Sequence, residues 1–135
     1  MSDNSNLVMV VEDEEVLLKA ITRKLEMTGK KVISCVSGKQ ALDYLNNIGE
    51  LPDIIWLDYY LKDMNGLEFM YTLKKNDAWS KIPVLVVSNS ASADKVSKML
   101  ALGAKKYMLK AESKLDDLVN EVNGIMTEKG GADVG

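Results

Sequence analysis

The sequence has 135 residues, the usual size of a single domain. Its net charge of -3 does not favour nucleic-acid binding, and the absence of histidine excludes a histidine general base, a histidine zinc ligand and a phosphohistidine carrier. The single cysteine, Cys35, excludes an internal disulfide and lies in an apolar stretch typical of a small buried residue. No apolar stretch approaches the ~20 residues of a membrane span, so we expect a cytoplasmic protein without a membrane partner.

Short apolar segments alternate with amphipathic segments along the chain. The apolar segments are rich in Val, Ile and Leu and are nearly uninterrupted by polar residues, which is typical of strands buried on both faces of a parallel sheet. They predict strands at residues 7–11, 31–35, 53–57, 82–87 and 105–109.

The segments that follow these strands carry apolar residues at spacings of three and four, which predicts helices. Expected helices span 14–28, 38–48, 66–76, 93–102 and 113–128. Five alternating units predict an α/β fold with a doubly wound, five-stranded parallel sheet and helices on both faces. We expect the domain to span 7–128, with residues 1–6 and 129–135 disordered.

Several residues mark the ends of the predicted helices. Two pairs have the spacing of a capping box, in which each residue's side chain accepts a hydrogen bond from the other residue's backbone N–H. Three glycines stand where helices are expected to stop. The pairs are Ser37 with Gln40 and Asn65 with Glu68, and the glycines are Gly29, Gly49 and Gly103.

Charged or hydroxyl side chains end four of the five predicted strands. Glu12 and Asp13 follow the first strand, Asp58 the third, Ser88 the fourth and Lys110 the fifth. The carboxyl ends of parallel strands share one edge of the sheet, where open α/β sheets bind ligands. We therefore expect these side chains to converge, since an acidic group at the end of a buried strand is costly unless it is used or paired.

The three carboxylates would repel one another unless a cation joined them. Oxygen ligands without His or Cys favour Mg²⁺ or Ca²⁺ over zinc, and a sparse cluster suits Mg²⁺, with Mn²⁺ as a substitute. Glu12 and Asp13 taken alone would be explained by the start of a helix, where acidic side chains are favoured. That explanation does not account for Asp58 at the end of another strand.

A carboxylate nucleophile, a divalent metal, a lysine and a hydroxyl together suit phosphoryl transfer. Asp58 would attack phosphorus in line, Lys110 would offset charge on the phosphoryl oxygens, and Ser88 would hydrogen-bond an oxygen placed on Asp58. A lone lysine or serine at a strand end is uninformative, so the prediction rests on the combination. No general base is needed, because an ionised carboxylate is already nucleophilic.

With these residues in place, the chain resembles the receiver domain of two-component response regulators over about residues 6–127. Each matching segment is weak alone, but their joint order is specific. The resemblance implies a flavodoxin-like (βα)5 fold with strand order 2-1-3-4-5. The segments are Val11-Glu12-Asp13-Glu14, Leu57-Asp58, Met64-Asn65-Gly66, Val87-Ser88, Gly103-Ala104 and Tyr107-Met108-Leu109-Lys110.

The resemblance implies roles for four positions in phosphorylation. Asp58 matches the phosphoacceptor, which would receive its phosphoryl group from a histidine kinase or a phosphotransfer protein. Asp13 matches a direct Mg²⁺ ligand and Glu12 an outer ligand acting through water. The backbone carbonyl of Tyr60 would complete the protein ligands of the metal.

Three further positions match the switch that such domains carry. Ser88 matches the switch hydroxyl, Lys110 the lysine that contacts the phosphoryl group, and Tyr107 the aromatic residue that turns inward when the hydroxyl moves. Tyr107 is equally compatible with an ordinary half-buried strand position. By resemblance, the fourth helix, fifth strand and fifth helix would form the face that binds a downstream protein.

Four positions depart from the family pattern. Lys62 and Ala111 stand where prolines are common, so the Lys110–Ala111 peptide bond could be either cis or trans. Asn89 replaces a small residue beside the hydroxyl, and Tyr60 is large enough to shield the site from attacking water. The rates of phosphorylation and hydrolysis are therefore open.

The leading interpretation is a single-domain response regulator, a phosphorelay switch that catalyses only its own phosphorylation and dephosphorylation. The alternative is a receiver-like binding module that works without phosphorylation. An aspartyl-phosphate phosphatase is disfavoured because Tyr60 stands where that family has a second aspartate. A flavodoxin-like cofactor carrier is disfavoured because the acidic run 12–15 would repel a phosphate.

Overall fold

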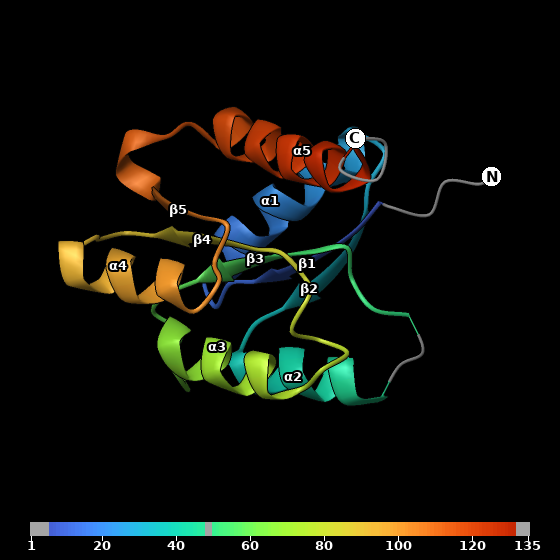
Figure 1. Ribbon diagram of the computed structural model, residues 1–135. Helices are drawn as coiled ribbons and strands as arrows, with labels where there is room; N and C mark the ends of the chain where they lie inside the picture. The colour runs from blue at the N-terminus through green and yellow to red at the C-terminus, as the bar shows by residue number, and fades with distance from the viewer. Residues whose placement is uncertain (1–5, 48–49, 132–135) are drawn as a thin grey trace.

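The computed structural model describes residues 6–47 and 50–131, the last four of these by their backbone alone. Five strands alternate with five helices, and all strand pairs are parallel. The sheet order β2-β1-β3-β4-β5 confirms the predicted doubly wound fold and its strand order (Figure 1). The strands are β1 (Leu7–Val11), β2 (Lys31–Cys35), β3 (Ile54–Asp58), β4 (Val84–Ser88) and β5 (Lys106–Leu109). The helices are α1 (Glu15–Met27), α2 (Gly38–Asn47), α3 (Gly66–Lys75), α4 (Ala93–Ala101) and α5 (Leu115–Gly131), with a 3-10 turn, η1 (Lys110–Glu112), before α5.

Two helical layers enclose the sheet. Helices α1 and α5 pack on one face, and α2, α3 and α4 pack on the other (Figure 1). All residues of β1, β3 and β4 are buried, because their side chains alternate between the two layers. This explains why the sequence of these central strands is apolar without interruption.

Three of the five strands differ from their predicted bounds, and β5 begins one residue later than expected. β3 begins and ends one residue later than expected, so Asp58 belongs to the strand and lies opposite Val87 of β4. β4 begins at Val84, two residues later than expected, and ends at Ser88, one residue later. Pro83 before it accepts a hydrogen bond from the backbone of Ile55, but its ring nitrogen has no proton to donate to the sheet.

The helix caps are confirmed in part. Asn65 and Glu68 form a complete capping box at the start of α3. At the start of α2, Ser37 Oγ accepts from the Gln40 backbone at 3.0 Å, but the Gln40 side chain accepts from the Val36 backbone instead of that of Ser37. The predicted box at α2 is therefore wrong in its reciprocal half.

Two of the three glycines predicted to end helices do so. Gly29 after α1 and Gly103 after α4 have φ angles of 85° and 105°, the left-handed region in which glycine is favoured. Gly49 lies outside the described residues.

The structure describes Asn6 and residues 129–131 within the two ends that the sequence predicts to be disordered. The side-chain amide of Asn6 donates to the carbonyl of Gly29, and its own carbonyl accepts from Lys31, so Asn6 is held against the start of β2. The helical backbone of α5 continues to Gly131, so residues 129–131 extend the helix. Residues 1–5 and 132–135 lie outside the described part of the chain. Within that part, none of the helices has the length and apolar character needed to cross a bilayer.

Gly66 and Gly124 form a matched pair for testing the packing beneath the site. A Cβ at Gly66 would lie 2.8 Å from the ring of Tyr59 and 3.3 Å from its Cα, whereas a Cβ at Gly124 in α5 meets nothing within 4 Å. We expect Gly66→Ala to lower the free energy of unfolding by about 1–3 kcal/mol. Gly124→Ala should raise it by about 0.5–1 kcal/mol, because alanine favours helix. Urea denaturation measures both changes, and a stabilising Gly66→Ala would contradict the packing described here.

Candidate functional site

The predicted strand-end residues converge at one edge of the sheet. Glu12 follows β1, Asp58 ends β3, Ser88 ends β4 and Lys110 follows β5. Glu12, Asp58 and Ser88 are almost fully buried, at 1%, 4% and 0% exposure. Burial of two carboxylates and a hydroxyl at adjoining strand ends sets this place apart from an ordinary solvated surface.

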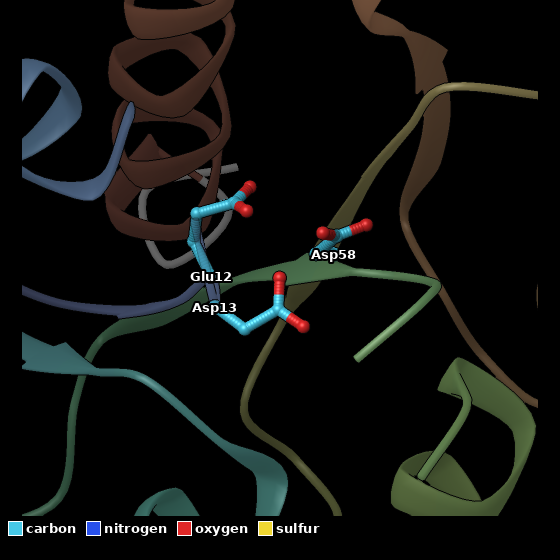
Figure 2. Close-up of side chains that lie close together, drawn as sticks. All are labelled: Glu12, Asp13 and Asp58. Carbon is cyan, nitrogen blue, oxygen red and sulfur yellow. The ribbon is translucent and has the colours of Figure 1, made fainter. Parts of the chain in front are cut away.

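Three carboxylates form a compact cluster here. Glu12, Asp13 and Asp58 can each present an oxygen within 4.8 Å of the others (Figure 2). Glu12 and Asp58 are buried, whereas Asp13 is partly exposed. The cluster therefore has one side open to solvent.

Lys110 is the cation that contacts this cluster. Its ammonium nitrogen lies 2.9 Å from Glu12 Oε1 and 3.4 Å from Asp58 Oδ2. One positive charge thus faces three carboxylates that can share a site. The remaining oxygens are held by the backbone two residues later: Glu14 N–H donates to Glu12 at 3.1 Å and Tyr60 N–H donates to Asp58 at 3.2 Å.

Burial and neighbouring charges change the protonation of Asp58. Burial first, and then the charge of Glu12, raise the pKa of Asp58 from 3.8 to about 7, and Lys110 only partly opposes them. Burial by itself would lower the pKa of Lys110, but its hydrogen bonds and charge interactions with Glu12 and Asp58 outweigh burial and raise it. Lys110 therefore stays charged at neutral pH, while Asp58 titrates there.

Ser88 and Tyr107 lie on the neighbouring strands β4 and β5. Ser88 Oγ accepts a long hydrogen bond, 3.4 Å, from the backbone of Ser90. The hydroxyl of Tyr107 donates to the carbonyl of the same residue, Ser90, at 2.7 Å. The loop that leaves β4 is thus held by a side chain from β5.

Tyr60 is placed by the loop that follows Asp58. Its side chain is 43% exposed, and its backbone forms an isolated bridge with Asn65 at the start of α3. The Tyr60 hydroxyl contacts Ser90 and Lys95, which the sequence did not single out as partners of this site. Their polar side chains look like ordinary solvated surface in the sequence, so no local signal identifies them.

Ala111, which stands where the family commonly has proline, leaves the contacts of Lys110 intact. The Lys110–Ala111 peptide bond is trans, as are the other peptide bonds in the described ranges. The chain continues from Lys110 into the 3-10 turn η1, and the lysine still reaches both buried carboxylates.

The donor set fits a hard divalent cation. All three cluster ligands are carboxylate oxygens, and one or two carboxylates completed by water are what Mg²⁺ usually takes from a protein. Burial and the charge of Glu12 raise the pKa of Asp58, which makes its ionised form costly here, and a bound cation would stabilise that form.

The comparison with protein families identifies the chain. The model of the response regulator receiver domain matches residues 8–123. The chain belongs to the receiver domain family of two-component response regulators. Members of this family are phosphoacceptor switches rather than conventional enzymes, generally bind Mg²⁺ in an acidic pocket, and interact with histidine kinases or phosphotransfer proteins.

Individual relatives agree with this assignment. The polar-differentiation response regulator DivK of Brucella anthropi is 32% identical over 103 residues, which cover 76% of this chain and 82% of DivK. A CheY-like receiver domain from Methanospirillum hungatei superposes with a TM-score of 0.84 over 96% of this chain and 99% of its own, at 22% identity. The Mn²⁺-bound response regulator Rcp1 gives a TM-score of 0.75 at 27% identity, covering 89% of this chain and 91% of its own.

Other relatives are longer than this chain. Plant response regulators from rice and Arabidopsis are 29–31% identical to it, and the matched region spans only about half of their length.

The acidic cluster predicts a characteristic dependence of stability on pH. The pKa of Asp58 is higher in the folded chain, about 7, than its ordinary 3.8, so folding binds a proton and stability falls as the pH rises between these values. Without divalent cations at about pH 8, Asp58→Asn should therefore be more stable than the wild type by about 1–2 kcal/mol, and the gain should shrink towards pH 5. Melting temperatures measure this difference.

An exposed carboxylate provides the control. Asp77 lies in the loop between α3 and β4, and Asp77→Asn should change stability little at either pH. A pH-independent effect of Asp58→Asn, or one as small as that of Asp77→Asn, would contradict the proposed charge imbalance.

Proposed function

We propose that the chain is a phosphorylation switch in which Asp58 receives a phosphoryl group from a histidine kinase or a phosphotransfer protein. The observation that carries the proposal is the buried Asp58 carboxylate, held between Lys110 and the acidic pair Glu12 and Asp13. Family membership supports it, because receiver domains are phosphoacceptors.

Glu12, Asp13 and Asp58 are the side chains that would hold Mg²⁺, with the backbone carbonyl of Tyr60 as a further ligand. Glu12 would act through water, since it is the carboxylate already bound by Lys110 at 2.9 Å. Mn²⁺ would substitute for Mg²⁺, and the relative Rcp1 has a form that binds Mn²⁺. When bound, the cation would neutralise charge on the phosphoryl oxygens and on the carboxylates.

The groups of the chain itself account for the transfer. An ionised Asp58 oxygen forms a bond to phosphorus while the bond from phosphorus to the donor nitrogen breaks, and the donor imidazole keeps the electron pair. Tyr60 N–H orients the Asp58 carboxylate. The ammonium group of Lys110 stabilises the negative charge that develops on the phosphoryl oxygens. The chain catalyses its own phosphorylation. It also catalyses its own dephosphorylation, in which water accepts the phosphoryl group.

Ser88 and Tyr107 would carry the signal outward. Ser88 is fully buried at the strand end next to Asp58, so its hydroxyl can turn to a phosphoryl oxygen. Tyr107 is tied to the carbonyl of Ser90, two residues after Ser88, so movement of this loop would release or capture the tyrosine. The α4, β5 and α5 face would then bind a downstream protein, with the switch acting in the cytoplasm.

Intact mass after incubation with acetyl phosphate and Mg²⁺ tests the proposal. We expect the wild type to gain one phosphoryl group and Asp58→Asn to gain none, because an amide is not a nucleophile towards phosphorus. Removal of Mg²⁺ with a chelator should prevent the gain.

A gain on Asp58→Asn equal to that of the wild type would contradict the assignment of the acceptor. No gain on the wild type, with Mg²⁺ binding shown separately, would favour the receiver-like module that works without phosphorylation or an acceptor that responds only to its own kinase.

A further inference from the structure

Tyr60 and Ser90 occupy equivalent places in neighbouring loops, each two residues beyond the end of a strand. β3 ends at Asp58 and β4 ends at Ser88, and these strands are paired, with Asp58 opposite Val87. The Tyr60 hydroxyl and Ser90 Oγ are 3.4 Å apart, so their side chains join the two loops. The bridge joins the loops that follow the two strands on which Asp58 and Ser88 are buried.

Lys95 holds the ring of Tyr60 by two kinds of interaction. Its ammonium group donates a hydrogen bond to the Tyr60 hydroxyl and lies 4.6 Å from the centroid of the ring. The same ammonium group lies 5.6 Å from the ring of Tyr59, which packs edge-on against Tyr60 with centroids 4.8 Å apart. Tyr60 is 43% exposed, so these contacts supply the order that burial does not.

The bridge is also tied to the opposite edge of the site. The backbone carbonyl of Ser90 accepts a hydrogen bond from the Tyr107 hydroxyl at 2.7 Å, while the Ser90 hydroxyl contacts Tyr60. Lys95 itself belongs to the first turn of α4, whose start is capped by Ser92. A chain of side-chain contacts therefore runs from the loop after β3, across the loop after β4, to α4 and β5.

We propose that Lys95 is a positioning residue that keeps Tyr60 across the mouth of the acidic site and thereby slows hydrolysis of phosphorylated Asp58. The inference rests on the proposed function above. In hydrolysis a water oxygen bonds to phosphorus while the bond from phosphorus to the Asp58 oxygen breaks, releasing inorganic phosphate, the free carboxylate and a proton. A ring fixed across the opening restricts the directions from which water can attack in line.

Substitution of Lys95 separates its charge from its bulk. Lys95→Met keeps a long unbranched side chain but removes the ammonium group, whereas Lys95→Arg keeps a cation that can stack on the ring. We expect Lys95→Met to take up the phosphoryl group as the wild type does, but to lose it about three- to tenfold faster. Lys95→Arg should restore most of the wild-type lifetime. Intact mass, followed after removal of acetyl phosphate, gives both uptake and decay.

Lys98 is the matched control on the same helix. It is exposed and pairs with Asp94, one turn away, so Lys98→Met should leave the phosphoryl lifetime unchanged. Melting temperatures of the Lys95 and Lys98 variants should stay near that of the wild type, because both side chains lie at the surface of α4.

A double variant distinguishes action through Tyr60 from any other effect. Tyr60→Ala should shorten the phosphoryl lifetime, and Lys95→Met should add nothing in that background. An unchanged lifetime in Lys95→Met, or an equal shortening with and without the Tyr60 ring, would overturn the inference. Absence of phosphoryl uptake by the wild type would instead overturn the proposed function, and this shows before any decay is measured.

Discussion

The arrangement at the strand ends depends on one lysine neutralising carboxylates that are buried with it. Lys110 follows an edge strand, β5, yet its ammonium group reaches past β4 to Asp58 on β3 and to Glu12 after β1. Removing such a cation would leave two carboxylates buried without a counter-ion, which is among the most costly changes a fold can undergo. The contact also joins residues 98 and 52 positions apart in the chain, so it forms only when the whole sheet is assembled.

The sheet order explains why this place became the site. The connections run in opposite directions on either side of β1 and β3, so the loops after these strands diverge and leave an opening between them. Glu12, Asp13 and Asp58 line that opening. A divalent cation can stabilise the negative charge that Lys110 leaves uncompensated, and burial together with the charge of Glu12 raises the pKa of Asp58 to about 7. Stability is thus given up at the site that the proposed function needs.

Much of the fold and the acidic site could be predicted from the sequence, because strand ends in a parallel sheet converge whatever the details of packing. Asp58, Glu12 and Lys110 were identified by their position after apolar runs, and the structure brings them into contact. Helix caps were less predictable. The Gln40 side chain accepts from the backbone of Val36 instead of that of Ser37, a difference of one residue that the capping-box spacing does not reveal. The contact between Lys95 and Tyr60 could not be predicted, since it depends on how far α4 lies from the loop after β3.

The most direct test of the account is the number of protons released when Mg²⁺ binds. Calorimetric titration in two buffers of different ionisation enthalpy measures it. Because the pKa of Asp58 is raised to about 7, binding should release close to one proton at about pH 5.5 and almost none at about pH 8.5. Asp58→Asn should lose the pH-dependent part. A release that is small at both pH values, or unchanged in Asp58→Asn, would show that Lys110 already compensates the buried charge and would contradict the account.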